Sequence, residues 1–292
     1  MKYQYIRESR PQYSVKKMCQ SLHVSRSGYY AWQGRTPSWR AVETARLRQR
    51  IVQLYEEHNG LVGSPMLAAD LRSDMAFAKI SRQRVARHMR SLGLRCRYIR
   101  KFVITTDSNH TEPLAENVLA RNFSPTAPDT AWVTDITYFK VGQQWNYLTV
   151  FIDLYSRMVV GWDVSDSLER HSVIRALRKA VRKRRPSPGL LVHSDRGVQF
   201  ASNDFRQELI RHGCVQSMSR KGNCWDNAVA ESFFHTLKAQ CVPPQGFATS
   251  QEAALALFQY IEIYYNRRRR HSTNGWLSPA EFEHRQTLRN VA

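Results

Sequence analysis

Three acidic residues in the second half of the sequence stand where a solvated charge is unexpected. Asp135 interrupts the apolar segment WVTDITYF, Asp195 ends the apolar run GLLVHSD, and Glu231 is the only carboxylate inside the helical segment AVAESFFHTLKAQ. A charge in an apolar strand is costly without a partner, and ligands gather at strand ends in α/β sheets. We therefore treat the three acids as candidates for one chemical site.

The segment 225–240 predicts the helix that positions Glu231. Asp226 is placed to cap its start, and an apolar stripe follows at helical spacing: Ala228, Val229, Phe233 and Leu237. Helical geometry puts three further residues on the face of Glu231: Asn227, His235 and Lys238. A polar face in water is the alternative interpretation of this pattern.

Converging carboxylates repel one another and raise one another's pKa unless a cation neutralises them. An all-oxygen set without a His or Cys cluster favours Mg²⁺ or Mn²⁺. Two such ions about 3.5–4 Å apart stabilise both the attacking and the leaving oxygen of a phosphoryl transfer. The acids thus predict two ions per site and a phosphate-bearing substrate.

The net charge points to the same kind of substrate. The 292 residues contain 44 Lys and Arg against 24 Asp and Glu, which gives +20. Such a field attracts DNA or RNA, and an anionic membrane surface is disfavoured because the charge is spread over several segments. The sequence has no membrane-spanning run and no signal peptide, and its five cysteines have no metal or disulfide spacing, so we expect a soluble cytoplasmic protein with reduced thiols.

The chain from 129 onward predicts the sheet that carries the acids. Three β-rich segments joined by short turns predict an antiparallel meander: AWVTDITYFK, WNYLTVFIDLY and RMVVGWDVS. The helix SVIRALRKAVRKRR then leads to GLLVHSD as a parallel strand, followed by a helix near 203–213, the strand CVQSM and the Glu231 helix. The order is βββαβαβα, an α/β mixed sheet. The last segment predicts a helix, a run of four arginines and a Pro-initiated turn or short helix.

The N-terminal half predicts helices only. Residues 13–32 outline a helix-turn-helix in which Ser25 caps the second helix, although an ordinary helical hairpin gives the same pattern. Residues 44–94 predict three more helices, the last capped by Ser81 and ended by Gly93. That last helix suits a DNA major groove, or else a solvated face, and its candidate phosphate contacts are Arg82, Arg84, Arg87 and Arg90.

We divide the chain into four parts. They are a helix-turn-helix-like segment (1–43), a basic helical DNA-binding domain (44–104), a proline-containing linker (105–128) and a catalytic core with a basic C-terminal segment (129–285).

Long segments of the chain resemble the second-reading-frame transposases of the insertion-sequence-three family of bacterial mobile elements. They are WVTDITYF, HSDRGVQF, GNCWDNAVAESFFHTLK and YNRRRRHSTNGWLSP, with VSRSGYYAW and ISRQRVARHMRSLGL upstream. The order Asp135, Asp195, Glu231, with 35 residues between the last two, resembles the acidic triad of retroviral-integrase-like enzymes.

The resemblance implies a ribonuclease-H-like core in which the three acids bind two Mg²⁺ ions. Water would cleave a strand at the element end, and the freed 3′-hydroxyl would attack a second phosphodiester. Lys238 would contact a phosphate or a terminal base. Further DNA contacts are expected from Asn227, Lys221, Arg267, Arg268, Arg269, Arg270 and His271, with Trp225 and the SRKGNC loop touching DNA.

Two polar residues near the acids have structural interpretations. We expect Asp153 to hydrogen-bond the turn at Ser156 and Arg157, and His193 to be a core histidine bonded to the backbone; a contribution of His193 to the metal site is the alternative.

The resemblance also implies partners. They are double-stranded DNA at the element ends and at the target, a homo-oligomer on DNA, since two ends must be joined, and a first-reading-frame protein or fusion; no membrane is expected. Two rival functions stay open at this stage: an inactive DNA-binding regulator that retains the fold, and a nuclease that does not transpose.

Overall fold

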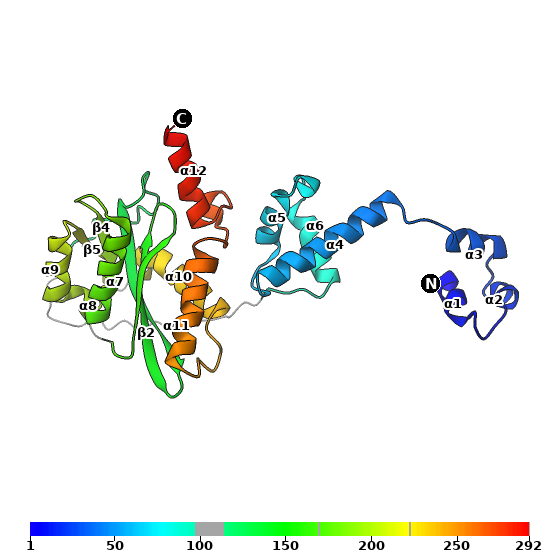
Figure 1. Cartoon of the computed structure of the whole chain (residues 1–292), viewed down its shortest axis with the longest axis horizontal. Coiled ribbons are helices and arrows are strands. Elements are labelled where there is room, and N and C mark those ends of the chain that lie inside the picture. Colours follow the sequence, from blue (N-terminus) through cyan, green and yellow to red (C-terminus); the bar gives the residue numbers. More distant parts are fainter. Residues whose placement is uncertain (97–113, 169, 222, 292) are drawn as a thin grey trace.

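The computed structural model describes residues 1–96, 114–168, 170–221 and 223–291, and Figure 1 follows them from small helical units to an α/β core. The first unit contains α1 (Lys2–Ser9), α2 (Val15–Ser21) and α3 (Arg26–Gln33). The hydroxyl of Ser25 accepts from Gly28 N at 3.0 Å, so the predicted cap of the second helix is confirmed. Helix α1 was not predicted, because Ile6 is its only buried residue and leaves no apolar period to detect.

The second helical unit contains α4 (Trp39–Glu57), α5 (Ser64–Arg72) and α6 (Arg82–Ser91). Ser81 caps α6, and Gly93 follows in the left-handed region with φ +70°, as predicted. Helix α5 ends at Arg72, and Asp74 then caps a short 3₁₀ turn (Met75–Phe77). The boundary placed at residue 43 falls inside α4.

The core is built on a five-stranded sheet in the order β3-β2-β1-β4-β5. Strands β1 (Ala131–Val141), β2 (Gln144–Asp153) and β3 (Val159–Ser165) form the predicted antiparallel meander. Strands β4 (Leu191–Ser194) and β5 (Val215–Met218) add in parallel on the other side of β1. This mixed order is that of ribonuclease-H-like folds, so the predicted fold class is confirmed.

Helices cover both faces of the sheet (Figure 1). Helix α7 (Arg170–Arg184), α8 (Val198–Ala201) and α9 (Asn203–Arg211) pack on one face around the fully buried Trp132. Helix α10 (Ala228–Gln240) and α11 (Ser250–Phe258) pack on the opposite face. Gly161 on β3 allows α7 to approach closely, since a Cβ there would lie 2.6 Å from Ala176 O.

The C-terminal segment is more helical than its sequence predicts. Helix α11 continues as a π-helical stretch (Gln259–Tyr265), and a 3₁₀ turn (Ser272–Asn274) precedes α12 (Pro279–Val291). The expectation of a turn or short helix after Pro279 is therefore wrong. Glu283 in the first half of α12 hydrogen-bonds Arg184 of α7 at 2.7 Å. None of the described helices is long and apolar enough to cross a membrane.

The second helical unit contacts the core through polar groups. The guanidinium of Arg270 pairs with Asp70 of α5 and also donates to Ser73 Oγ at 2.9 Å. Asp70 lies 2.9 Å from Nε2 of the buried His58, and Gln240 at the end of α10 donates to Leu61 O at 2.9 Å. The helix that carries Glu231 thus ends on the second helical unit.

Candidate active site

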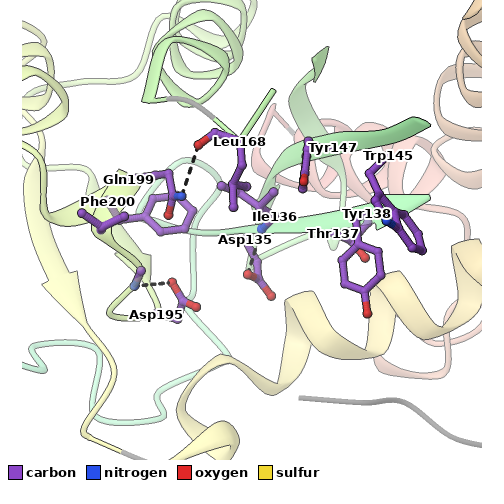
Figure 2. Close-up of a pocket in the computed structure, with 12 residues that line it drawn as sticks. Asp135, Ile136, Thr137, Tyr138, Trp145, Tyr147, Leu168, Asp195, Gln199 and Phe200 are labelled. Carbon is purple, nitrogen blue, oxygen red and sulfur yellow. Dashed lines mark hydrogen bonds between the residues drawn. The ribbon is translucent and has the colours of Figure 1, made fainter. Parts of the chain in front are cut away.

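Two of the three predicted acids line one cavity. Asp135 lies in β1, Asp195 follows β4 directly, and both border a cavity of about 540 Å³ together with Tyr138, Trp145 and Phe200. Figure 2 shows the two side chains facing the same space, with α10 running past it. The parallel pairing of β1 with β4 explains this arrangement, because it places the middle of one strand beside the end of the other.

Local backbone contacts fix the two aspartates. Oδ1 of Asp195 accepts from Gly197 N at 3.0 Å, which closes the turn between β4 and α8. Oδ1 of Asp135 accepts from Ile136 N at 2.8 Å. Each carboxylate therefore has one oxygen held by the backbone.

Glu231 reaches the same electrostatic environment from α10. Burial raises the pKa of the Asp135 carboxyl well above its ordinary value, and the negative charges of Asp195 and Glu231 raise it further. Burial and the charge of Asp195 likewise raise the pKa of Glu231. The three acids, which come from three separate elements, thus lie close enough to oppose one another's ionisation.

The donor set is chemically suited to a hard divalent cation. All three groups are carboxylates, and their mutual repulsion is what a bound cation would relieve. Within the described ranges, no three acid, histidine or cysteine side chains converge closely enough to hold an ion together. The three residues are therefore of the right chemical type to bind a divalent cation. Their carboxylates do not converge on a single point in this structure.

Lys238 also lies beside the acids. Its Nζ is 4.4 Å from the centre of the Tyr138 ring, on the wall of the cavity. Burial lowers the pKa of Lys238, and the nearby Asp135 opposes that shift. The sequence placed Lys238 on the face of Glu231, and the structure brings it to Asp135 as well.

The start of α10 differs from the prediction in how Asp226 is used. Asp226 was expected to cap the helix, but a 3₁₀ turn (Cys224–Asn227) precedes α10 and the fully buried carboxylate binds other segments. It accepts from Arg220 Nε at 2.9 Å, Arg121 Nε at 2.7 Å and Asn117 Nδ2 at 2.9 Å. These bonds lower its pKa, that of Arg220 most strongly. Asp226 therefore fastens Asn117 and Arg121 to the start of α10. Residues 105–113 of the predicted linker (105–128) lie outside the described residues.

The structural interpretation of Asp153 is confirmed. Its Oδ2 accepts from Ser156 Oγ at 3.2 Å, and Arg157 N donates to its carbonyl at 2.8 Å. Burial, followed by the charge of Asp129, raises the pKa of Asp153 to about 6.

The interpretation of His193 as a core histidine bonded to the backbone is confirmed. The side chain is fully buried and hydrogen-bonds the backbone at Asp226, and its ring nitrogens also face two hydroxyls. Nδ1 lies 2.8 Å from Ser217 Oγ, and Nε2 lies 3.2 Å from Ser219 Oγ. Burial lowers the pKa of His193 to about 4.

The predicted DNA contacts on α6 lie on its surface. Arg82, Arg87 and Arg90 are exposed, while Val85 and Met89 are buried toward the small core of the second helical unit. Arg84 is half-buried and donates to Glu43 of α4 at 2.9 Å. The exposed three form a basic face, and their contact with DNA stays a prediction.

The C-terminal basic run divides into two groups. Arg267 and Arg268 are exposed, whereas Arg270 pairs with Asp70. Arg269 lies 3.4 Å from Nε2 of His271, whose pKa is lowered to about 3 by burial and then by Arg269. The second group therefore contributes to tertiary structure.

The loop before α10 is exposed. Lys221 is on the surface, and the indole of Trp225 has an exposed fraction of 69%. Asn227, by contrast, is 4% exposed and donates to Thr134 O at 3.2 Å. Sequence reasoning did not predict this bond, because neither residue is unusual in its own segment.

Known proteins match both halves of the chain. Models of the integrase core domain match residues 125–224 and 231–288, and an HTH-like domain model matches residues 43–102. A 31 kDa protein of insertion element IS600 from Shigella sonnei is 41% identical over 91% of this chain and 97% of its own length. Transposase InsF of insertion sequence IS3A from Escherichia coli K12 is 38% identical over 98% of this chain and 99% of its own length.

Solved structures with related folds are more distant. A simian T-cell lymphotropic virus intasome has a TM-score of 0.44 and 14% identity, covering 80% of this chain and 74% of that one. The HTLV-2 integrase catalytic core in complex with magnesium has a TM-score of 0.39 and 16% identity, covering 54% of this chain and 97% of that one.

The mixed sheet and the integrase-core match define the class: a polynucleotidyl transferase of the integrase-core type. The match to InsF is more specific, because the 38% sequence identity extends over nearly the full length of both chains. The chain belongs to the IS3 family of insertion-sequence transposases.

Proposed function

We propose that this transposase cleaves DNA at the ends of its element and joins the freed ends to target DNA at the cavity lined by Asp135 and Asp195. The observation that carries the proposal is the cavity that Asp135 and Asp195 line together, beside which Glu231 lies close enough for its charge to raise the pKa of Asp135. A structural protein gains nothing from three acids that oppose one another's ionisation. A phosphoryl-transfer site requires such a set, because a cation then neutralises both the acids and the substrate.

Asp135, Asp195 and Glu231 would hold one or two Mg²⁺ or Mn²⁺ ions. When bound, such ions stabilise the charge that develops on the attacking and leaving oxygens of a phosphodiester. Lys238 adds a positive charge beside Asp135 for a DNA phosphate. Tyr138 supports the Lys238 ammonium through its ring face.

The basic surfaces would hold the DNA duplex. Exposed Arg82, Arg87 and Arg90 form one candidate contact face, and Lys221 with Arg267 and Arg268 form others nearer the core. Because two element ends must meet for joining, we propose that the chain acts as an oligomer on DNA, assisted by a first-reading-frame protein or fusion.

The test is strand cleavage and joining on labelled DNA carrying the element end, with Mg²⁺ and with the first-frame fusion present. The wild type should expose a 3′-hydroxyl and join it to target DNA. Glu231→Gln keeps the side-chain shape but removes the charge, so it should bind the same DNA without cutting it. Glu281→Gln, which removes an exposed carboxylate of α12, serves as the matched control and should cut normally.

Equal cutting by wild type and Glu231→Gln would remove Glu231 from the site. Specific DNA binding with no cutting by any form would favour the regulator over the transposase.

A further inference from the structure

The start of α10 departs from an ordinary helix start. Asn227 occupies the N-cap position, where an asparagine side chain usually accepts a hydrogen bond from the first turn of its own helix. Here the side chain makes no such bond. Its amide nitrogen instead donates to Thr134 O at 3.2 Å, across to β1. The helix thus gives up a local cap for a tertiary bond.

The carbonyl that Asn227 reaches is the one left without a partner strand. Carbonyls alternate along β1: Thr130 O accepts from Leu191 N of β4, and Ala131 O accepts from Leu154 N on the β2 side. By this alternation Thr134 O points to the β4 side. The pairing of β1 with β4 ends at Val133 and His193, one residue earlier.

The register shows which group Asn227 replaces. Thr130 O pairs with residue 191, so a continued ladder would pair Thr134 O with the backbone N–H of Asp195. The chain turns away after Ser194, and the Asn227 amide takes the place of that N–H. Asn227 therefore stands where β1 and the Asp195 turn separate.

This location connects all three acids. Thr134 directly precedes Asp135, the replaced N–H belongs to Asp195, and Glu231 lies four residues after Asn227 on α10. The Asn227 side chain is 4% exposed, and its Oδ1 is buried with no hydrogen-bond partner in the described part of the chain. A buried acceptor without a donor is unfavourable, so its retention calls for a role.

We infer that Asn227 is a positioning residue that sets the spacing of Asp135, Asp195 and Glu231 for divalent-cation binding, and that it is not a DNA contact. The inference rests on the proposed function, since it assigns Asn227 to the same site. Residues that orient metal-binding groups typically change metal affinity or activity about 10- to 100-fold when removed. Asn227 should show an effect of this size on Mg²⁺ binding.

The test measures Mg²⁺ binding without DNA, by calorimetry and by the shift of melting temperature with Mg²⁺ concentration. Asn227→Leu removes both polar atoms at similar volume, and Asn227→Ala covers the case in which leucine does not fit. Either folded variant should need about 10- to 100-fold more Mg²⁺ for half-saturation. Its DNA affinity in EDTA should equal that of the wild type.

The matched control is Asn274→Leu. Asn274 is 2% exposed and donates to Ser156 O at 2.6 Å, so it makes the same kind of bond away from the acids. This variant should lower the melting temperature and leave the Mg²⁺ dependence unchanged.

Two results would overturn the inference. The first is wild-type Mg²⁺ affinity in the folded Asn227 variants while Glu231→Gln loses Mg²⁺ binding, which leaves the proposed site intact. The second is weakened DNA binding in EDTA with unchanged Mg²⁺ affinity, which makes Asn227 a DNA contact. If Glu231→Gln binds Mg²⁺ as the wild type does, the proposed function fails instead.

Discussion

Arg270 forms an ion pair with Asp70, and this pair joins the C-terminal basic run to helix α5 of the HTH-like domain. The side chains of Arg270 and Asp70 have exposed fractions of only 18% and 11%. An arginine run that the sequence assigns to DNA thus supplies one residue to the junction between the HTH-like domain and the integrase core.

Removing this ion pair should weaken the junction. In Asp70→Asn the largely buried guanidinium loses its counter-charge, so we expect a loss of about 2–4 kcal/mol in the free energy of unfolding. Urea unfolding of Asp70→Asn, Arg270→Gln and the double variant measures the coupling energy. Glu57→Gln, which breaks the exposed pair with Arg50, should change stability by less than about 0.5 kcal/mol. Strict additivity of the two single variants would contradict the pairing.

The ionisation of Asp153 should make stability fall as pH rises through the weakly acidic range. Its pKa in the folded protein is about 6, above the ordinary value of 3.8, so the folded state retains a proton that the unfolded state has released. The contribution of Asp153 to the free energy of unfolding is therefore complete below pH 4. It declines by about 3 kcal/mol in all as the pH rises to about 6. Burial is the main cause of the shift.

Asp153→Asn isolates this effect. The amide can still accept from Tyr155 N and can donate to Ser156 Oγ, so the turn is preserved. In denaturant unfolding between pH 4 and pH 8, the free energy of unfolding of the variant should rise relative to that of the wild type from pH 4 to 6. Above pH 6 the difference between the two should stay constant. A difference that does not vary with pH would show that Asp153 ionises normally.

Gly161→Ala should destabilise the core. The new methyl carbon would lie 2.6 Å from both Ala176 O and Ala180 Cβ, so α7 would have to move away from β3. Such overpacking typically costs about 1–3 kcal/mol. Thermal unfolding compares it with Gly34→Ala, whose methyl would meet nothing closer than 3.6 Å and should be neutral. A melting temperature equal to the wild type would mean that this contact is looser than described.

The exposed face of α6 should contribute to the salt dependence of DNA binding. Replacing Arg82, Arg87 and Arg90 by glutamine removes up to three phosphate contacts, and each contact contributes about 0.9 to the slope of log K against log salt. Fluorescence anisotropy with end-sequence DNA should show a slope shallower by up to about 3. Arg211→Gln removes another exposed arginine charge, on α9, and should leave the slope unchanged. An unchanged slope in the triple variant would assign DNA binding to another surface.

Local signals in the sequence were sufficient for the elements that carry the acids. The β-branched and aromatic residues around Asp135 predicted β1, and the short apolar run before Asp195 predicted β4. Serines at residues 25 and 81 marked helix starts that the structure confirms. Such signals are local because a helix start or a strand depends mainly on residues within a few positions. Helix α12 was underestimated, and its contact with α7 through Glu283 and Arg184 has no local signal in the sequence.

The sequence by itself therefore determined the fold class, the positions of the three candidate acids and the basic character of the surface. Only the tertiary structure decided which polar side chains serve the site and which join segments. Asp226 binds residues 117–121 instead of capping its helix, Arg270 meets Asp70, and Asn227 reaches Thr134. The physical reason is that a buried polar group must find its partner wherever the packed chain supplies one, and that partner can lie 93 residues away, as for Asn227, or 200 away, as for Arg270.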